Sequence, residues 1–410
     1  MLKKNYVPQH SFTDMRRFIN DNDGFLLFGA DNTGVTFRKW LLKQDKTVNG
    51  FIDNDSKKIG TVLDGLSVFN FEKLNVKDPK IIITSIHSHE ISKQLEKMGL
   101  EIFINYIPFD NYGWINTEKF INSIGSLFYK EFHKSINKYE EVLTILSDEQ
   151  SKEIYERVIN YRLTALDPIE RGEENLPIPL EKYRKEAIQY HDNLTRIRSS
   201  LATKFNGDIV EILSQTLAKK PYIYKNKVTN NNLNVVIDAG GFIGDTAMAF
   251  GYSSPNGYVY TFEPSRNSYK KIKEVERTFL NIIPVKAGLW NEDKIVKLTE
   301  IEEQPNGSFI NEDGKDVQVY KLDTFVKKYN IKKVDFIKMD IEGAEYNALK
   351  GALQTIKRDY PDLAICIYHS PEDLWRIPLW IKENFPKYNI YIDHKDGMFV
   401  WGTVCFATVR

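Results

Sequence analysis

The chain has 410 residues, too many for one ordinary hydrophobic core, so two or three domains are expected. Its 56 Lys and Arg residues balance 56 Asp and Glu residues, and this zero net charge offers no electrostatic surface for nucleic acid. No segment is long and apolar enough for a membrane span, and the first residues lack the apolar core of a secretory signal. We therefore expect a soluble cytoplasmic protein with no nucleic-acid partner.

Residues 24–107 alternate short apolar strands with helical segments, which predicts a parallel sheet with helices on both faces. A strand runs into a glycine turn over residues 29–34, and the next strand ends at Asp53. Asp31 stands where a dinucleotide turn has its middle glycine, and its carboxylate would repel a pyrophosphate. Asp53 could hold a ribose, but a domain that binds no ligand or contacts a protein fits this segment equally well. We assign residues 1–112 to a smaller Rossmann-like α/β domain.

Residues 113–228 change to long helices, because apolar residues recur there at helical spacing. Within them, residues 147–150 (Ser-Asp-Glu-Gln) have the composition of a helix cap and first turn. We expect a helical connector that packs on the C-terminal domain and borders its pocket.

Residues 229–410 form a second α/β domain with seven predicted strands, five parallel and then an antiparallel C-terminal pair. The strands cover residues 235–237, 257–262, 282–287, 334–339, 363–368, 388–392 and 403–409. Segments 294–298 and 316–320 predict a small inserted β-hairpin. Such a mixed sheet is expected of the Rossmann-like class I methyltransferase fold, whereas a dehydrogenase sheet is all parallel. Cys366 and Cys405 lie in the strand segments and are expected to be buried, reduced thiols.

A glycine-rich turn, Asp-Ala-Gly-Gly-Phe-Ile-Gly-Asp at residues 238–245, follows the first strand of this domain and begins a helix. A dinucleotide fingerprint needs a glycine where Ala239 stands. The pattern Asp-x-Gly-x-x-x-Gly, with the acid on the strand end, is common in S-adenosylmethionine (SAM) methyltransferases. Glu263 ends the next strand, where an acid can accept hydrogen bonds from both hydroxyls of a ribose. The turn and the acid together favour a nucleoside-containing cofactor.

Charged residues follow the fourth and fifth strands of the same domain. Lys338 and Asp340 share one side of the fourth strand, with Glu345 close by, and His369 ends the fifth strand at the same edge. Methyl transfer to a hydroxyl requires removal of a proton, for which His369 is the natural general base. The alternatives are an ion-paired strand end with a helix-capping acid, and a histidine that caps the next helix. No Cys or His cluster has zinc spacing, so we assign no metal ligands.

The C-terminal domain resembles FkbM-type methyltransferases, whose motifs occur in the same order here. They are Asp-Ala-Gly-Gly-Phe-Ile-Gly-Asp-Thr at 238–246, Phe-Glu-Pro at 262–264, Lys-Leu-Asp at 321–323, Ile-Lys-Met-Asp-Ile-Glu-Gly-Ala-Glu at 337–345 and His-Ser-Pro-Glu-Asp-Leu-Trp at 369–375. Residues 146–164 are also similar to the stretch that precedes the domain in longer members. The N-terminal domain looks like the Rossmann-like domain that precedes sugar-modifying transferases and binds nucleotide-sugars.

The resemblance implies a SAM-dependent O-methyltransferase acting on a hydroxyl of a small polar acceptor, a sugar or nucleotide-sugar of surface glycan biosynthesis. We place SAM at Asp238, Gly240, Gly241, Gly244, Asp245, Glu263 and Asp340. The predicted reaction centre comprises His369, Asp340, Lys338 and Glu345. The acceptor stays open, and an oligomer is compatible with the sequence.

Two other functions are compatible with parts of the chain. An NAD-dependent sugar oxidoreductase or epimerase could use the first glycine turn, but Asp31 and the absence of a Tyr-x-x-x-Lys pair from residues 1–112 oppose it. The pair formed by Tyr269 and Lys273 belongs to the other α/β domain. A non-catalytic scaffold of tandem α/β domains would not need charged residues to converge at one sheet edge.

Overall fold

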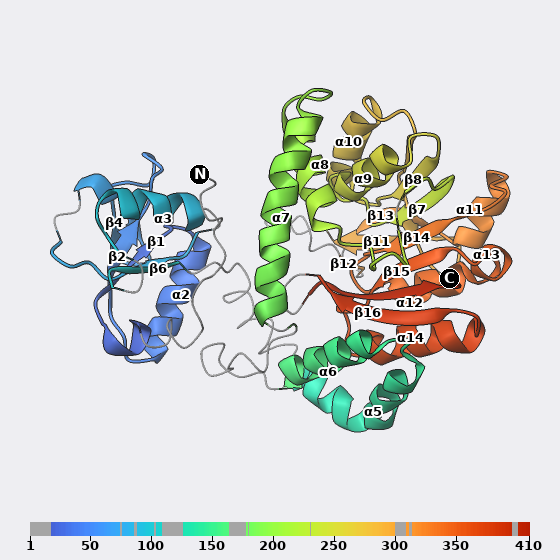
Figure 1. Ribbon diagram of the computed structural model, residues 1–410, viewed down its shortest axis with the longest axis horizontal. Coiled ribbons are helices and arrows are strands. Elements are labelled where there is room, and N and C mark those ends of the chain that lie inside the picture. Colours follow the sequence, from blue (N-terminus) through green and yellow to red (C-terminus); the bar gives the residue numbers. More distant parts are fainter. Residues whose placement is uncertain are drawn as a thin grey trace. The chain divides into compact units, whose positions relative to one another are not determined.

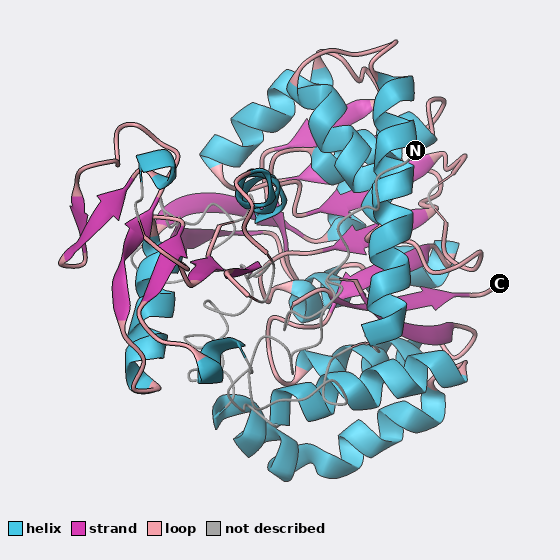
Figure 2. Ribbon diagram, turned by 60° about the vertical axis from the view of Figure 1, so that its left-hand side comes forward, coloured by secondary structure: helices cyan, strands magenta, loops and turns pink. Residues whose placement is uncertain are grey.

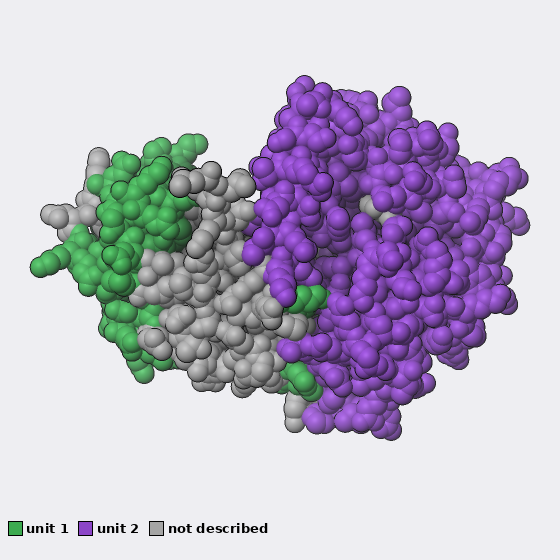
Figure 3. All heavy atoms as spheres, viewed as in Figure 1, with its two compact units in different colours: residues 1–126, 160–184 green, residues 127–159, 185–410 purple. Residues whose placement is uncertain are grey.

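The protein is described by a computed structural model in which the chain separates into two compact units. Unit 1 comprises residues 1–126 and 160–184, and unit 2 comprises residues 127–159 and 185–410 (Figure 3). The predicted domain boundaries at residues 112 and 228 stay predictions. The structure describes residues 18–73, 76–85, 88–101, 104–108, 126–163, 178, 180–229, 231–299, 309–310, 314–395 and 401–410.

Unit 1 contains a six-stranded sheet with the order β3-β4-β2-β1-β5-β6 (Figure 1). The elements are β1 (Phe25–Phe28), α2 (Asn32–Lys43), β2 (Val48–Ile52), β3 (Val62–Leu63), β4 (Leu66–Phe69), the 3-10 turn η1 (Phe71–Lys73), β5 (Ile81–Ile83), α3 (Ser88–Lys97) and β6 (Tyr106–Pro108). All its strand pairs are parallel except β3 with β4. The side chains of β1 alternate between two cores, one shared with Phe37 and Leu41 of α2 and the other with Ile91 and Leu95 of α3. Helices therefore cover both faces, which explains why β1 is apolar at every position.

Unit 2 is built on a seven-stranded mixed sheet with the order β16-β17-β15-β14-β7-β8-β9. The strands are β7 (Val235–Ala239), β8 (Tyr258–Phe262), β9 (Ile282–Val285), β14 (Phe336–Met339), β15 (Asp362–Cys366), β16 (Asn389–His394) and β17 (Thr403–Thr408). The first five are parallel, and β17 pairs antiparallel with both β15 and β16. The predicted fold class is confirmed. Cys366 and Cys405 are buried free thiols, as expected.

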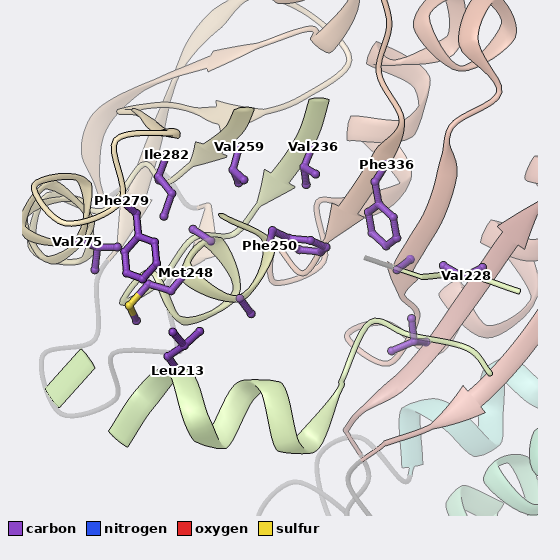
Figure 4. Close-up of a cluster of buried hydrophobic side chains, with 14 of the residues drawn as sticks. Leu213, Val228, Val236, Met248, Phe250, Val259, Val275, Phe279, Ile282 and Phe336 are labelled. Carbon is purple, nitrogen blue, oxygen red and sulfur yellow. The ribbon is translucent and has the colours of Figure 1, made fainter. Parts of the chain in front are cut away.

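Helices flank the strands of this sheet on both sides (Figure 2). They are α7 (Leu180–Leu201), α8 (Asp208–Lys219), α9 (Asp245–Ser253), α10 (Arg266–Glu276), α11 (Leu322–Lys328), α12 (Glu345–Gly351), α13 (Leu353–Asp359) and α14 (Asp373–Asn384). Leu213 of α8, Phe250 of α9 and the inward residues Val236, Val259 and Phe336 of three strands share one core (Figure 4). Helix α9 lies between the sheet and α8, which explains its largely apolar sequence.

The inserted hairpin is larger than predicted and forms a four-stranded sheet with the order β10-β13-β11-β12. Its strands are β10 (Gly288–Leu289), β11 (Lys294–Thr299), β12 (Phe309–Ile310) and β13 (Lys315–Tyr320). The predicted pairing is present, because β11 and β13 are antiparallel with Lys294 opposite Val319. The short β10 and β12 were missed because two-residue strands carry no periodicity of their own.

Helices α5 (Ser126–Ile145) and α6 (Glu149–Leu163) precede the sheet in sequence, and the chain between them joins its edge. The Ser147 N–H donates to the Ile390 carbonyl of β16 at 2.8 Å, and the Ile390 N–H donates to the Ser147 hydroxyl. Asp148 accepts a hydrogen bond from the Ser151 N–H, so the predicted cap of α6 is confirmed. Among the helices that the structure describes, none is long and apolar enough to cross a bilayer.

Candidate active site

The glycine turn after β7 packs directly against the end of β14. Gly240 has φ +85°, and a Cβ placed there would lie 1.8 Å from the Asp340 carbonyl oxygen. A Cβ on Gly241 would lie 2.4 Å from the Thr261 hydroxyl oxygen. Gly244, with φ +86°, immediately precedes α9. Only glycine satisfies both the backbone conformation and the contact at Gly240, so the motif is explained by packing between strand ends.

Asp238 lies beneath this turn and is fully buried. Its carboxylate accepts hydrogen bonds from the Thr246 and Thr261 hydroxyls at 3.0 and 2.8 Å and forms an ion pair with Lys338 at 3.1 Å. The structure thus gives Asp238 internal partners on both oxygens. These contacts favour a positioning role for Asp238, and its predicted contact with a cofactor stays a prediction.

Lys338 supports the turn from the neighbouring strand. Its ammonium donates to the Ala239 and Gly240 carbonyls at 3.0 and 2.6 Å and faces Asp238. Burial alone would lower the pKa of Lys338, but the carboxylates of Asp238, Asp340 and Asp245 outweigh burial and raise it. A buried, charged lysine whose hydrogen bonds all go to the turn is poorly placed to exchange protons with a substrate. These contacts favour a positioning role for Lys338, and its predicted catalytic role stays a prediction.

Glu263 stands at the tip of β8, beside the turn. Its two carboxylate oxygens accept hydrogen bonds from the Phe242 N–H at 2.9 Å and the Ser265 N–H at 2.8 Å. Burial raises the pKa of Glu263 to about 7, against the opposing effect of these two bonds. Because a carboxylate oxygen has more than one acceptor position, ribose hydroxyls can still bind. Burial also raises the pKa of Asp245, the half-buried first residue of α9.

Asp340 follows β14 and is held by two tyrosines that the sequence analysis missed. The Tyr222 and Tyr368 hydroxyls each donate to one of its carboxylate oxygens at 2.9 Å. Burial alone would raise the pKa of Asp340, but His369, Lys338 and these hydroxyls outweigh it and hold the pKa below its ordinary value. Tyr368 could have been noticed beside His369 in the motif. Tyr222 comes from the segment after α8 and carries no comparable signal.

His369 is surrounded by carboxylates. Its Nδ1 lies 3.0 Å from Glu345, and its Nε2 lies 3.5 Å from Asp340 and 3.6 Å from Glu342. Burial alone would lower the pKa of His369, but Glu345, Asp340 and Glu342 outweigh it and raise the pKa to about 10. With its pKa raised, His369 is suited less to accepting a proton than to holding the carboxylates around it, and its predicted role as general base stays a prediction.

The loop from β14 to α12 brings two further carboxylates to His369. Glu345 is fully buried, and one of its oxygens accepts a hydrogen bond from the Ile341 N–H at 2.7 Å. Glu342 was not among the predicted site residues. It has φ +55°, a conformation that is uncommon outside glycine, and its side chain is 43% exposed. The predicted residues Asp340, Glu345 and His369 are thus brought together, with donor atoms within 4.8 Å of one another.

The loop after His369 is fixed by α5 of the same unit. The Tyr139 hydroxyl of α5 donates to the Pro371 carbonyl at 2.9 Å. Trp375 donates from its ring nitrogen to Glu131, and the Lys138 ammonium lies 3.8 Å from its ring centroid. One face of Trp375 is therefore covered by a cation, so the ring contributes to packing of this loop.

The glycine turn of unit 1 satisfies its own acid. Asp53 accepts hydrogen bonds from the Ala30 N–H at 3.0 Å and the Asp55 N–H at 2.9 Å, and it forms an ion pair with Lys58. Burial would raise the pKa of Asp53, but these bonds outweigh it and lower the pKa. The hydrogen bond from the Ala30 N–H to Asp53 resembles the one from the Phe242 N–H to Glu263 in unit 2. Asp53 differs from Glu263 in that it also forms an ion pair with Lys58. These contacts account for the position of the Asp53 carboxylate without a bound ribose.

Strand order, a glycine turn after the first strand and acids at the carboxyl edge define unit 2 as a class I methyltransferase fold. The crystal structure of Methyltransferase FkbM from Methylobacillus flagellatus KT shares the fold, with a TM-score of 0.54 and 17% identity over 96% of this chain and 93% of that chain. Residues 238–388 match the family described as Methyltransferase FkbM domain.

Other solved structures match with lower scores. Fibrillarin from Aeropyrum pernix, with natively bound S-adenosyl-L-methionine, has a TM-score of 0.29 and 13% identity over 43% of this chain and 67% of that chain. Precorrin-6y C5,15-methyltransferase from Geobacter metallireducens GS-15 has a TM-score of 0.30 and 12% identity over 48% and 86%. A comparison with curated proteins found no match.

Proposed function

We propose that the protein is a SAM-dependent O-methyltransferase that acts on a hydroxyl of a small polar acceptor, a sugar or nucleotide-sugar. The proposal rests on the position of Glu263 beside the glycine turn at the carboxyl edge of the sheet. Its carboxylate oxygens accept hydrogen bonds from the backbone N–H groups of Phe242 and Ser265 there. Open α/β sheets bind ligands at this edge. The match of residues 238–388 to the FkbM domain supports the same activity.

The residues of the edge suit SAM, which when bound supplies an electrophilic methyl group. Glu263 would accept hydrogen bonds from the ribose hydroxyls, and the turn at Gly240 and Gly241 allows the backbone to approach a ligand closely. Asp238 and Lys338 keep this turn in place from inside the sheet. The sulfonium of SAM is a cation, and the carboxylates at the edge favour a cation.

The acceptor would lose its hydroxyl proton to a carboxylate of this chain. Asp340 is a poor acceptor of that proton, because His369, Lys338 and two tyrosine hydroxyls hold its pKa below the ordinary value. Glu342 is exposed and lies in the loop beside His369, so we propose that its carboxylate takes the proton. The acceptor oxygen gains the methyl group as the bond from sulfur breaks, which leaves S-adenosylhomocysteine. His369, as an imidazolium, would position Asp340 and Glu342.

The sugar-like acceptor is supported by the chemistry of the edge. Asp340, Glu342 and Glu263 are hydrogen-bond acceptors, and a polyol supplies many donors. Nucleotide-sugar binding by unit 1, a cytoplasmic location and a role in surface glycan synthesis stay predictions from the sequence.

Calorimetric titration of SAM tests the cofactor assignment. We expect Glu263→Ala to weaken SAM affinity at least about tenfold, since a pair of hydrogen bonds to a carboxylate contributes more than about 1.4 kcal/mol. Asp335→Ala is a matched control, because Asp335 also accepts two backbone N–H bonds, from Asn234 and Val235, at the opposite end of the sheet. Wild-type affinity in a folded Glu263→Ala variant would exclude this cofactor site.

Transfer of a labelled methyl group to candidate nucleotide-sugars tests the reaction. Glu342→Gln should lower turnover about a hundredfold while SAM affinity stays within about twofold, because a general base contributes mainly to the chemical step. Unchanged turnover in Glu342→Gln would remove Glu342 as the proton acceptor. SAM binding without transfer to any polyol would refute the acceptor class.

A further inference from the structure

We propose that Asp340, Glu345 and His369 bind a divalent metal cation, and that the metal-free imidazolium of His369 releases its proton as the cation binds. Their donor atoms lie within 4.8 Å of one another. Around a cation with bonds of about 2.1 Å, opposite ligands are about 4.2 Å apart, so movements of a few tenths of an ångström would complete the site. The sequence predicted these three residues at one sheet edge as part of a reaction centre and not as metal ligands, because ligands from two strand ends and a helix start show no metal-site spacing.

The fold positions these ligands independently of any cation. Strands β14 and β15 are parallel neighbours, with Met339 opposite Ile365, so their following residues reach the same edge. Asp340 is oriented by Tyr222 and Tyr368, and Glu345 by the Ile341 N–H. Ligands held by partners outside the metal shell are typical of built metal sites.

Buried oxygen atoms that have no hydrogen-bond partner in the described part of the chain make this cluster suited to bind a cation. Glu345 is fully buried, and its second carboxylate oxygen has no hydrogen-bond partner among the described residues. The same holds for one oxygen of the fully buried Asp373, which interacts electrostatically with Glu345 and His369. Neither ring nitrogen of His369 has a hydrogen bond of good geometry within the described chain. Buried carboxylates without partners are costly, and a divalent cation would satisfy them.

The charge balance of the cluster also favours a divalent cation. Four carboxylates, those of Asp340, Glu342, Glu345 and Asp373, interact with one histidine. The nearby cations are Arg376, which pairs with Asp373, and Lys338, which acts on Asp340 but pairs with Asp238. A donor set of two carboxylates and one imidazole suits Mn²⁺ and other first-row cations and leaves coordination positions open. An acceptor hydroxyl could occupy such a position. Coordination of the acceptor hydroxyl rests on the proposed function, whereas binding of the cation does not.

Binding of Mn²⁺ to the full chain tests the inference. The chain is treated with chelator, dialysed and titrated with MnCl₂, and free Mn²⁺ is followed by its electron paramagnetic resonance signal. We expect one bound Mn²⁺ per chain. Asp340→Asn and Glu345→Gln should each weaken this binding at least about tenfold, since removal of even an outer-shell partner has effects of this size.

Asp335→Asn is the matched control, because Asp335 also accepts backbone hydrogen bonds but lies before β14, at the opposite end of the strand from Asp340. We expect it to change Mn²⁺ affinity by no more than about threefold, because its charge lies more than a Debye length away from the three ligands. Asp340 is only partly buried, so its asparagine variant is expected to fold even if the Glu345 variant does not. Circular dichroism verifies that each titrated variant is folded.

The outcomes separate the metal site from the methyltransferase proposal. Absence of stoichiometric Mn²⁺ binding, or equal binding by wild type and Asp340→Asn, would overturn the metal site. SAM binding in the presence of chelator would leave the cofactor assignment intact in that case. Conversely, Mn²⁺ binding without SAM binding would support the metal site and remove the proposed methyl transfer.

Discussion

Charged side chains at the carboxyl edge of unit 2 perform two different tasks. Asp238 and Lys338 are buried and use their polar atoms on the glycine turn and its neighbours. Glu263 and Asp340 keep acceptor capacity at the edge, although backbone or tyrosine donors already orient them. A carboxylate at this edge therefore supports the fold when its side chain points into the sheet, and is available to a ligand when it points out of the edge.

Glu263 should make stability depend on pH. Its pKa is about 7 in the folded chain against 4.5 ordinarily, so between these values the folded state keeps a proton that the unfolded chain has released. The free energy of unfolding therefore falls as pH rises through this window. The side chain of Glu263→Gln stays neutral at every pH. Between pH 4.5 and 7, the free energy of unfolding of the wild type should therefore fall by on the order of 3 kcal/mol relative to that of the variant. Urea unfolding across this range measures it.

Asp335→Asn is the control for this titration. Burial would raise the pKa of Asp335, but hydrogen bonds from Asn234, Lys333 and Val235 outweigh it and lower the pKa. The stability that this ionised carboxylate contributes is lost only as the pH falls below its ordinary value. The difference between wild type and Asp335→Asn should hence stay flat between pH 4.5 and 7, and a flat Glu263→Gln profile would contradict the prediction.

At the scale of elements, α6 completes a hydrogen bond that α14 cannot make. Pro378 lies inside α14 and has no N–H to donate to the carbonyl of Leu374, four residues earlier. The buried Tyr155 hydroxyl of α6 donates to that carbonyl at 3.1 Å. Together with the bond from Tyr139 to Pro371, this contact fixes the chain that follows His369. Helices that precede the sheet in sequence thus support the edge that carries the site.

A double-mutant cycle tests this relation. Tyr155→Phe should destabilise unit 2 by about 1–3 kcal/mol, because it leaves a buried carbonyl without a donor. In a Pro378→Ala background the new N–H can bond to Leu374, so the same substitution should be less costly by about 1 kcal/mol. Urea unfolding of the four proteins gives the coupling. Additive effects of the two substitutions would refute the compensation of Pro378 by Tyr155. As a control, Tyr329→Phe changes an exposed ring and should alter the free energy of unfolding by no more than about 0.5 kcal/mol.

At the scale of the whole molecule, each of the two units has its own sheet and core. We expect two calorimetric unfolding transitions, since such units unfold separately when each buries its own apolar surface. SAM at a hundred times its dissociation constant should stabilise one transition by about 2.7 kcal/mol and leave the other unmoved. The shifted transition should be that of unit 2, identified by loss of the shift in Glu263→Ala. A single two-state transition would contradict this expectation.

Local patterns in the sequence determined much of the fold. Apolar runs predicted the parallel strands, and the glycine spacing and Glu263 predicted the arrangement at the edge of unit 2, because periodicity and backbone conformation are properties of short segments. The convergence of Asp340, Glu345 and His369 also followed from strand order. Only the tertiary structure decided that Lys338 turns inward, that Tyr222 reaches Asp340 and that three carboxylates lie around His369 and raise its pKa. Side-chain direction and protonation depend on neighbours that are distant in the chain, and folding alone brings these neighbours together.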